Sequence, residues 1–310
     1  MKLKDFCQKA FFQGTFINIE DAKIPVMTNA LHYGNGVFGG LRGYYNGDKK
    51  FLSLFRLKDH YNRLLSSLKI LGVSIPYSQS DLVEITTNLV KKNKPNTDVY
   101  LRPLAYAKSL NISPSFEKDK IFDFCLFMFP LGEYLPINKG LSTMITTWRR
   151  VSDTAIPARA KITGAYVNSS LAHQEAVDNG YDEAIFLTEN GQVSEGSAAN
   201  LFIVRDGVLI TASKTDDVLE GVTRKTILEL AKNLKIPTEE RLIDKSELYI
   251  SNEAFFSGTG VQISWISKVD KRMVGNGKKG PVTEKLQNLF FKVVRGNNDD
   301  YKNWLTVISF

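Results

Sequence analysis

The chain has 310 residues, of which 43% are apolar and 24% are charged, so it can form one large or two medium domains around a substantial core. Its 40 basic and 33 acidic residues give a net charge of +7, but the two signs are mixed along the chain, which argues against nucleic-acid binding. The two cysteines and three histidines form no disulfide framework and no metal-ligand pattern. The polar N-terminus and the short apolar runs predict a cytoplasmic protein that has no signal peptide and no membrane span.

The first part of the chain predicts mixed α and β structure. A turn at 13–14 between β-prone runs predicts a hairpin. A strand at 51–54 leads into an amphipathic helix that ends at Gly72. Asp81 with Glu84 predicts the capped start of a second helix.

Residues 29–43 combine glycines with aromatic residues. This composition fits closely packed backbone that lines a cavity, and it also fits a Gly-rich strand with a bulge. In the predicted strand at 98–106, Tyr100 and Arg102 are two residues apart and therefore face the same side. That pair fits either an exposed edge or a binding pocket. The apolar run at 122–129 predicts a strand that is buried on both faces.

The second half predicts one helix followed by several hairpins. The helix covers 164–179 and is closed by Gly180, and a strand at 183–188 ends at the strong turn signal of 190–191. A further turn at 206–207 follows the next strand. An amphipathic helix at 282–294 completes the chain.

Chemically capable residues are placed among these elements. Lys161 lies in a small, turn-prone segment, and the return strand of the first hairpin contains Glu195. Taken alone, the two residues fit a solvated loop lysine and a turn acid. Residues 221–223 begin a helix whose free N–H groups favour an anion, although an ordinary cap explains them equally well. The predicted strand at 253–260 ends in small residues.

Together, these blocks resemble the class IV (fold-type IV) pyridoxal-phosphate aminotransferases, and most closely the branched-chain amino acid aminotransferases. The resemblance covers nearly the whole chain and rests on the order and spacing of its blocks, which are H-Y-G-x-x-V-F-x-G-L-R at 32–42, F-R-x-x-x-H-x-x-R-L at 55–64, Y-L-R-P at 100–103, the lysine and tyrosine at 161 and 166, S-E-G-x-x-x-N-L at 194–201, L-x-G-V-T-R at 219–224 and S-G-T-G at 257–260. Three departures are Gly39 in place of a glutamate, Gly260 in place of an alanine, and 109–112 in place of a Gly-rich loop.

The resemblance implies an α+β fold with two domains: a small α/β N-terminal domain at 1–133, an interdomain linker at 134–140, and a larger C-terminal pseudo-barrel domain at 141–310 that binds the cofactor. The implied cofactor is pyridoxal 5'-phosphate. The implied reaction is transamination of leucine, isoleucine and valine with 2-oxoglutarate, as in branched-chain amino acid biosynthesis. The implied partners are small amino acids and 2-oxo acids, and further copies of the chain in a homodimer or larger homo-oligomer, without nucleic acid or membrane.

The resemblance also assigns residues to roles. It makes Lys161 the catalytic residue. The implied cofactor-binding residues are Arg56, Lys161, Tyr166, Glu195, Val222, Thr223 and Thr259. The implied substrate-binding residues are Tyr33, Phe38, Gly40, Tyr100, Arg102, Thr259 and Gly260.

The departures at Gly39 and 109–112 leave two related activities open, transamination of D-amino acids or (R)-amines and aminodeoxychorismate lyase activity. Tyr100 with Arg102, and Tyr33 with Phe38, favour the branched-chain type. A basic nucleic-acid-binding protein is the alternative from another class, and the sequence contains no basic-aromatic recognition motif that supports it.

Overall fold

The computed structural model describes residues 5–48, 50–116 and 121–309. Within it, the chain forms two compact units. The first unit contains Met1–Gly132, Ala160–Gly164 and Lys292–Phe310, and the second contains Glu133–Arg159 and Ala165–Phe291. The short segment with Lys161 therefore belongs to the first unit. The linear division with a linker at 134–140 stays a prediction.

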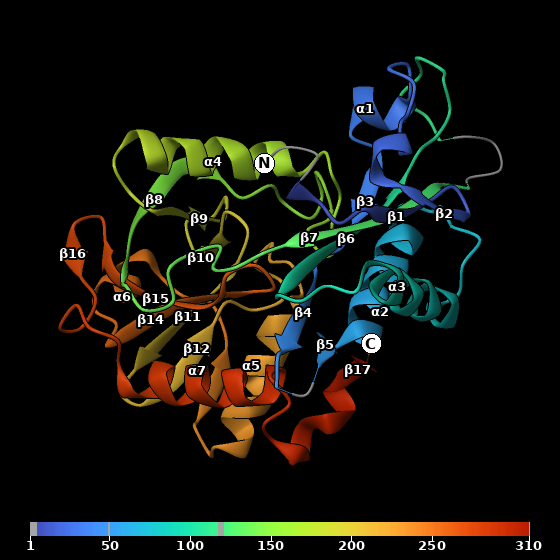
Figure 1. The fold of residues 1–310 in the computed structure, drawn as a ribbon. Helices are drawn as coiled ribbons and strands as arrows, with labels where there is room; N and C mark the ends of the chain where they lie inside the picture. The colour runs from blue at the N-terminus through green and yellow to red at the C-terminus, as the bar shows by residue number, and fades with distance from the viewer. Residues whose placement is uncertain (1–4, 49, 117–120, 310) are drawn as a thin grey trace. The chain divides into compact units, whose positions relative to one another are not determined.

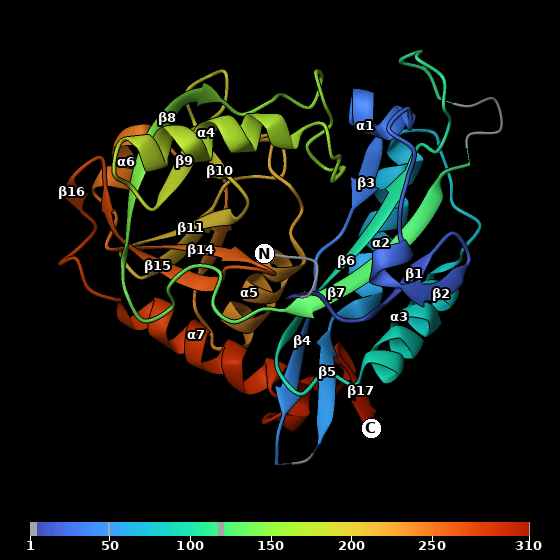
Figure 2. The ribbon, with the colours of Figure 1, turned by 45° about the horizontal axis from the view of Figure 1, so that its top comes forward.

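An eight-stranded sheet forms the centre of the first unit, in the order β17-β5-β4-β6-β7-β1-β2, with β3 paired to β6. Its strands are β1 (Lys9–Phe12), β2 (Thr15–Asn18), β3 (Gly36–Phe38), β4 (Leu41–Asn46), β5 (Phe51–Phe55), β6 (Val99–Tyr106), β7 (Asp123–Pro130) and β17 (Leu305–Ser309). The helices of this unit are η2 (Ile19–Asp21), α1 (Asn29–Tyr33), α2 (Leu57–Ile70), α3 (Gln79–Asn93) and η3 (Asp299–Trp304). Figure 2 shows α2 and α3 together along one side of the sheet.

Several elements of this unit follow from local sequence signals. The predicted hairpin forms, with left-handed backbone at 13–14 between β1 and β2. The apolar stripe of α2 is buried, and Gly72 takes a φ of 68° just beyond the helix. The prediction for α3 was wrong in detail, because the capping box is made by Ser78 and Asp81 instead of Asp81 and Glu84.

Two other predictions need correction. Residues 29–43 contain the short helix α1 before β3 and β4, so they are not a simple bulged strand. Strand β7 is not equally buried on both faces: Phe124, Leu126 and Met128 are nearly inaccessible, whereas the alternate residues are half-buried. The half-buried face is covered in part by the ring of Phe6, which packs edge-on against Phe129.

The second unit contains a nine-stranded sheet in the order β10-β9-β8-β15-β14-β11-β12-β13, with β16 paired to β15. Because β10 pairs with β9 on one side and with β11 on the other, six of these strands close into a ring. The strands are β8 (Leu141–Arg149), β9 (Glu183–Leu187), β10 (Val193–Gly196), β11 (Asn200–Arg205), β12 (Val208–Thr211), β13 (Thr238–Glu240), β14 (Glu253–Gly258), β15 (Gln262–Val269) and β16 (Arg272–Met273). This ring is the pseudo-barrel that the resemblance implied.

Helices surround this sheet, and they are α4 (Tyr166–Asp178), α5 (Val222–Asn233), α6 (Lys245–Tyr249) and α7 (Pro281–Val294). Figure 1 shows α4 lying along β8 and β9, against which it buries Ala172 and Ala176. The predicted turn at 206–207 forms as a two-residue hairpin, with φ values of 50° and 81°. The turn at 190–191 also forms, but it is not the two-residue hairpin that the sequence predicts: only Gly191 is left-handed, with a φ of 86°, and Thr188 N–H donates to the Gln192 carbonyl across a three-residue loop. The α+β fold is thus confirmed. Within the described ranges, we find no helix long and apolar enough to span a bilayer.

Candidate functional site

The segment that contains Lys161 is fixed to the residues around β3. The carbonyl of Lys161 accepts a hydrogen bond from the backbone N–H of Phe38 at 3.0 Å, and Thr163 N–H donates to the Gly36 carbonyl at 2.8 Å. Gly34 and Gly164 approach so closely that a Cβ on Gly34 would lie 2.6 Å from the Gly164 Cα. This close backbone approach explains why residues 34 and 36 are glycines, and it holds Lys161 in place.

Aromatic and cationic groups surround the Lys161 side chain. Its Nζ atom lies 4.9 Å from the centre of the Phe38 ring, and the Arg102 guanidinium lies 4.7 Å from the same ring. Arg102 also donates to the Tyr100 hydroxyl at 3.3 Å. A Cβ on Gly40 would overlap that hydroxyl. The structure thus brings four of the predicted substrate residues together with Lys161.

Tyr33 connects α1 to the loop at 109–113, which departs from the family pattern. Its hydroxyl donates to the Ile112 carbonyl. The buried Asn29 side chain donates to Asn111 Oδ1 at 3.0 Å and to the Ser113 carbonyl at 2.7 Å. These bonds fix the position of the loop relative to Tyr33.

One face of α2 lies against the Lys161 segment. The backbone N–H of Lys161 donates to the Ser67 hydroxyl at 3.3 Å, and that hydroxyl donates to the Arg63 carbonyl at 2.8 Å. His60 is buried on the same helix, and its pKa is lowered well below the usual value by burial and by the positive charges of Arg63, Lys161 and Arg56. Its side chain is therefore neutral at physiological pH.

Arg56 forms its contacts at the start of α2. Its guanidinium pairs with Asp59 at 3.1 Å and stacks over the Trp304 ring at 3.8 Å, and its side chain is 3% exposed. Its backbone is left-handed, with a φ of 46°. The structure thus places Arg56 among structural contacts of the first unit, and its assignment to the cofactor phosphate stays a prediction.

In the second unit, the hairpin of β9 and β10 brings Glu195 to a buried position that is 5% exposed. One carboxylate oxygen forms an ion pair with Arg150 Nη2 at 3.0 Å. The other accepts bonds from the Asn200 side chain at 2.8 Å and from the Leu219 N–H at 3.2 Å. Glu195 is therefore a fixed, buried carboxylate, and not a solvated turn acid.

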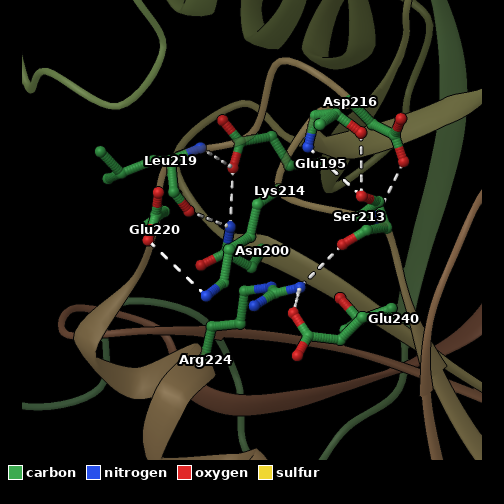
Figure 3. Close-up of polar contacts among 12 residues, drawn as sticks. Glu195, Asn200, Ser213, Lys214, Asp216, Leu219, Glu220, Arg224 and Glu240 are labelled. Carbon is green, nitrogen blue, oxygen red and sulfur yellow. Dashed lines mark hydrogen bonds and ion pairs between the residues drawn. The ribbon is translucent and has the colours of Figure 1, made fainter.

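The N-terminus of α5 lies beside this carboxylate, as Figure 3 shows through the contacts of Asn200. The Asn200 side chain also donates to the Leu219 carbonyl at 2.9 Å, and its oxygen occupies the place that a Cβ on Gly221 would take. Val222 and Thr223 form the first turn of α5 and are nearly buried. A helix start of this kind suits an anion such as a phosphate.

The remaining predicted residues also belong to the second unit. Tyr166 is the first residue of α4 and is half-buried. Thr259 and Gly260 follow β14 and are half-buried, and a Cβ on Gly260 would lie 3.7 Å from the Tyr134 ring. Their predicted roles stay predictions.

Sequence reasoning missed three residues that these contacts single out, Arg63, Arg150 and Asn200. Arg63 and Asn200 stand inside the quoted motifs, so their position there was an available signal. Arg150 lies outside all of these motifs, and only the folded chain brings it to Glu195.

The chemistry available in each unit is distinct. The first unit presents a lysine amine beside an aromatic wall and a guanidinium. The second presents a fixed carboxylate beside a helix N-terminus. An amine can act as nucleophile and proton carrier, and the other groups can bind charged parts of small molecules.

Comparisons with known proteins identify the family of the chain. The family described as "Amino-transferase class IV" matches residues 36–269. The "Probable branched-chain-amino-acid aminotransferase" of Aquifex aeolicus (strain VF5) is 42% identical and is aligned over 99% of both chains. A branched-chain aminotransferase from Thermoproteus uzoniensis, solved with norvaline, superimposes with a TM-score of 0.93 at 40% identity, over 97% of this chain and 99% of that one.

A further solved structure is the branched-chain amino acid aminotransferase from Thermobaculum terrenum in its PLP-form, the holo-form. It superimposes with a TM-score of 0.93 at 33% identity, over 99% of this chain and 100% of that one. Near-complete coverage at this identity leaves no doubt about the family. The chain belongs to the class IV aminotransferases.

Proposed function

We propose that this protein is a pyridoxal-phosphate-dependent aminotransferase that converts leucine, isoleucine and valine, with 2-oxoglutarate, into their 2-oxo acids and L-glutamate. The names of the similar proteins support the reaction class. The observation that carries the proposal is the placement of Lys161 beside Phe38 and Arg102. An apolar ring next to a guanidinium suits a pocket that accepts both an aliphatic side chain and the second carboxylate of glutamate.

The residues of the chain fit the proposed cofactor. The cofactor supplies an electron-accepting ring that stabilises negative charge on the substrate α-carbon. The amine of Lys161 would bind the cofactor and then carry the proton between the substrate α-carbon and the cofactor. Glu195 would accept a hydrogen bond from the ring nitrogen, and Tyr166 would bind the ring oxygen. The α5 N-terminus, with Val222 and Thr223, and Thr259 would hold the phosphate.

For the phosphate, we also propose Arg63, which the sequence prediction did not include. Arg63 shares a face of α2 with Ser67, whose hydroxyl binds the Lys161 backbone. Its charge, like that of Lys161, acts on the buried His60. Arg56 by contrast is engaged with Asp59 and Trp304. The choice between the two arginines is testable by paired variants.

The proposed substrate residues of the first unit are Tyr33, Phe38, Gly40, Tyr100 and Arg102. Because Arg102 and Tyr100 are hydrogen-bonded, they would bind a substrate carboxylate as a pair. Gly40 would keep the space open for the Tyr100 hydroxyl. In the second unit, Thr259 and Gly260 would contribute backbone N–H groups to the α-carboxylate.

We further propose that the protein acts as a cytoplasmic homodimer in branched-chain amino acid biosynthesis. An apolar surface around α1 supports self-association, and we call it the α1 patch. The α1 patch consists of Ile24, Val26, Met27, Leu31, Leu110 and Ile112, of which Ile112 is 84% exposed. Large apolar side chains gathered on one surface are typical of an interface.

The test is a half-reaction. Protein loaded with pyridoxal phosphate is mixed with L-leucine in the absence of any 2-oxo acid, and the visible absorption of the bound cofactor is followed. We expect the visible band to fall while a near-ultraviolet band of pyridoxamine phosphate grows, and we expect 2-oxoglutarate to reverse the change. Lys161→Ala should abolish both changes.

The same experiment separates the alternatives. A band that is insensitive to L-leucine but responds to D-alanine or (R)-phenylethylamine would contradict the proposed substrate class. Turnover of aminodeoxychorismate without any 2-oxo acid would indicate a lyase. A protein that binds no cofactor would refute the role of Lys161.

A further inference from the structure

The carboxylate of Glu195 is held at both oxygen atoms. Arg150 Nη2 lies 3.0 Å from Oε1, while Asn200 Nδ2 and the Leu219 N–H donate to Oε2 at 2.8 and 3.2 Å. The Glu195 and Arg150 side chains are only 6% and 11% exposed. Figure 3 shows Asn200 and Leu219 reaching the same oxygen from a strand and from the loop before α5. One ion pair and two hydrogen bonds from three segments therefore fix the orientation of one carboxylate.

The donors are themselves anchored within the second unit. The Arg150 Nε–H donates to the Asp217 carbonyl at 3.1 Å, and the guanidinium lies 5.7 Å from the centre of the Phe186 ring. The backbone N–H of Arg150 donates to the Leu187 carbonyl at 2.9 Å. Arg150 is thus held between the sheet and the loop at 213–220, and its guanidinium cannot turn away from Glu195 without losing its contacts to Asp217 and Phe186.

Asn200 connects the carboxylate to the start of α5. Its amide donates to Glu195 and to the Leu219 carbonyl, while its oxygen lies against Gly221, the residue before the helix. A shift of Asn200 would therefore displace the carboxylate relative to the helix N-terminus. One side chain sets the spacing between the two groups that we propose for the ring nitrogen and the phosphate.

A buried carboxylate is costly unless it is paired, and groups that donate to it favour its ionised form. We propose that Arg150 and Asn200 are positioning residues that keep Glu195 ionised and correctly oriented to accept a hydrogen bond from the protonated ring nitrogen of the cofactor. This inference rests on the proposed function. Without the arginine charge, the buried carboxylate loses its ion pair and no longer favours a protonated ring nitrogen.

The experiment compares the cofactor with an analogue that lacks the ring nitrogen. Dissociation constants are measured by equilibrium titration for pyridoxal phosphate and for its deaza analogue, in which a C–H group replaces the ring nitrogen. Because a charge-assisted hydrogen bond is lost, we expect the native protein to bind the analogue about 10-fold to 100-fold more weakly. The quantity compared between variants is the ratio of the dissociation constant of the analogue to that of pyridoxal phosphate. Arg150→Gln, Asn200→Ala and Glu195→Gln should each bring this ratio close to one.

The controls separate positioning from general damage. Arg150→Lys keeps a positive charge and should retain most of the ratio, and Arg149→Gln, a change at the exposed neighbouring arginine, should leave it unchanged. Adding Arg150→Gln to Glu195→Gln should not reduce the ratio further. Asn200→Ala removes a neutral partner, so it tests the inference even where Arg150→Gln does not fold.

The outcomes are distinguishable. If Arg150→Gln and Asn200→Ala weaken both ligands equally and keep the native ratio, their role is only structural and the inference is wrong. If Glu195→Gln itself keeps the native ratio, the proposed role of Glu195 fails and the inference fails with it. A loss of the ratio in all three variants supports the inference independently of catalytic activity.

Discussion

At the scale of single residues, the site depends on charges whose neighbours are already fixed. Arg102 and Lys161 both lie within 5 Å of the Phe38 ring centre, at 4.7 and 4.9 Å. Arg56 stacks on Trp304, and Arg150 pairs with Glu195. Lys161 and Arg102 are the cations that we propose for the substrate, whereas the contacts of Arg56 are structural.

The two arginines of α2 should behave differently when they are replaced by glutamine. Arg63→Gln should weaken pyridoxal phosphate binding by at least tenfold, because a charge-assisted contact to the phosphate is lost. Arg56→Gln should chiefly lower the midpoint of thermal unfolding, because it removes the contacts to Asp59 and Trp304. Cofactor titration and thermal unfolding of both variants check this. Weaker cofactor binding in Arg56→Gln than in Arg63→Gln would indicate that Arg56 binds the phosphate.

His60 should make folding stability depend on pH. Its folded pKa is depressed, so the unfolded chain takes up a proton that the folded chain refuses, and stability falls as the pH drops below the unfolded value of about 6.5. The loss attributable to His60 is at most about 1.4 kcal/mol per pH unit. His60→Gln should flatten denaturant-derived stability between about pH 7 and pH 5, measured against the native protein.

His173 provides the matched comparison, because its pKa is raised by its hydrogen bond to Glu183. The contact of protonated His173 with Glu183 stabilises the fold at low pH, and this stabilisation is lost as the pH rises through the folded pKa of His173. His173→Gln should therefore steepen the loss of stability on acidification. Equal slopes for both histidine variants would contradict the assignment of His60 as a buried neutral group.

At the scale of elements, strands and helix starts are joined by residues that pack so closely that a larger side chain would not fit. Gly221 precedes α5 and lies against the Asn200 oxygen, while the Asn200 amide nitrogen donates to the Leu219 carbonyl and so connects β11 to the loop before the helix. The backbone of Gly221 has a φ of −68°, so any residue could adopt it. Contact with Asn200, and not backbone conformation, therefore requires glycine here.

Gly221→Ala should weaken cofactor binding by about tenfold, because the new methyl group must displace Asn200 and with it the Glu195 carboxylate. Gly132→Ala is the control, since a Cβ there meets nothing within 4 Å. Titration with pyridoxal phosphate measures both. Unchanged affinity in Gly221→Ala would show that Asn200 does not transmit position to Glu195.

At the scale of the whole molecule, the proposed homodimer depends on the α1 patch. Leu31→Asp with Ile112→Asp should convert a dimer into a monomer of 34.8 kDa, because two charges enter an apolar interface. Light scattering after size-exclusion chromatography gives the mass, with the exposed Lys91→Asp as control. A native protein that already has the monomer mass would refute the homodimer.

The sequence alone determined the features that local chemistry controls. The turns at 13–14, 190–191 and 206–207 follow from residues that accept left-handed backbone, and the stripe of α2 follows from helical periodicity. The order of the motif blocks was sufficient to predict the family, and the family match confirms it. The predicted start of α3 was wrong by only a few residues, because several acidic residues near a helix start satisfy the same pattern.

Only the tertiary structure decided which side chains meet. Lys161 belongs to the first unit because its segment bonds to β3, although it is far from β3 along the chain. Arg150 reaches Glu195 because β8 and β9 are neighbours in a sheet that closes through β10. Long-range pairing of this kind depends on sheet topology and burial, which no local pattern encodes, and it determines which charge faces which.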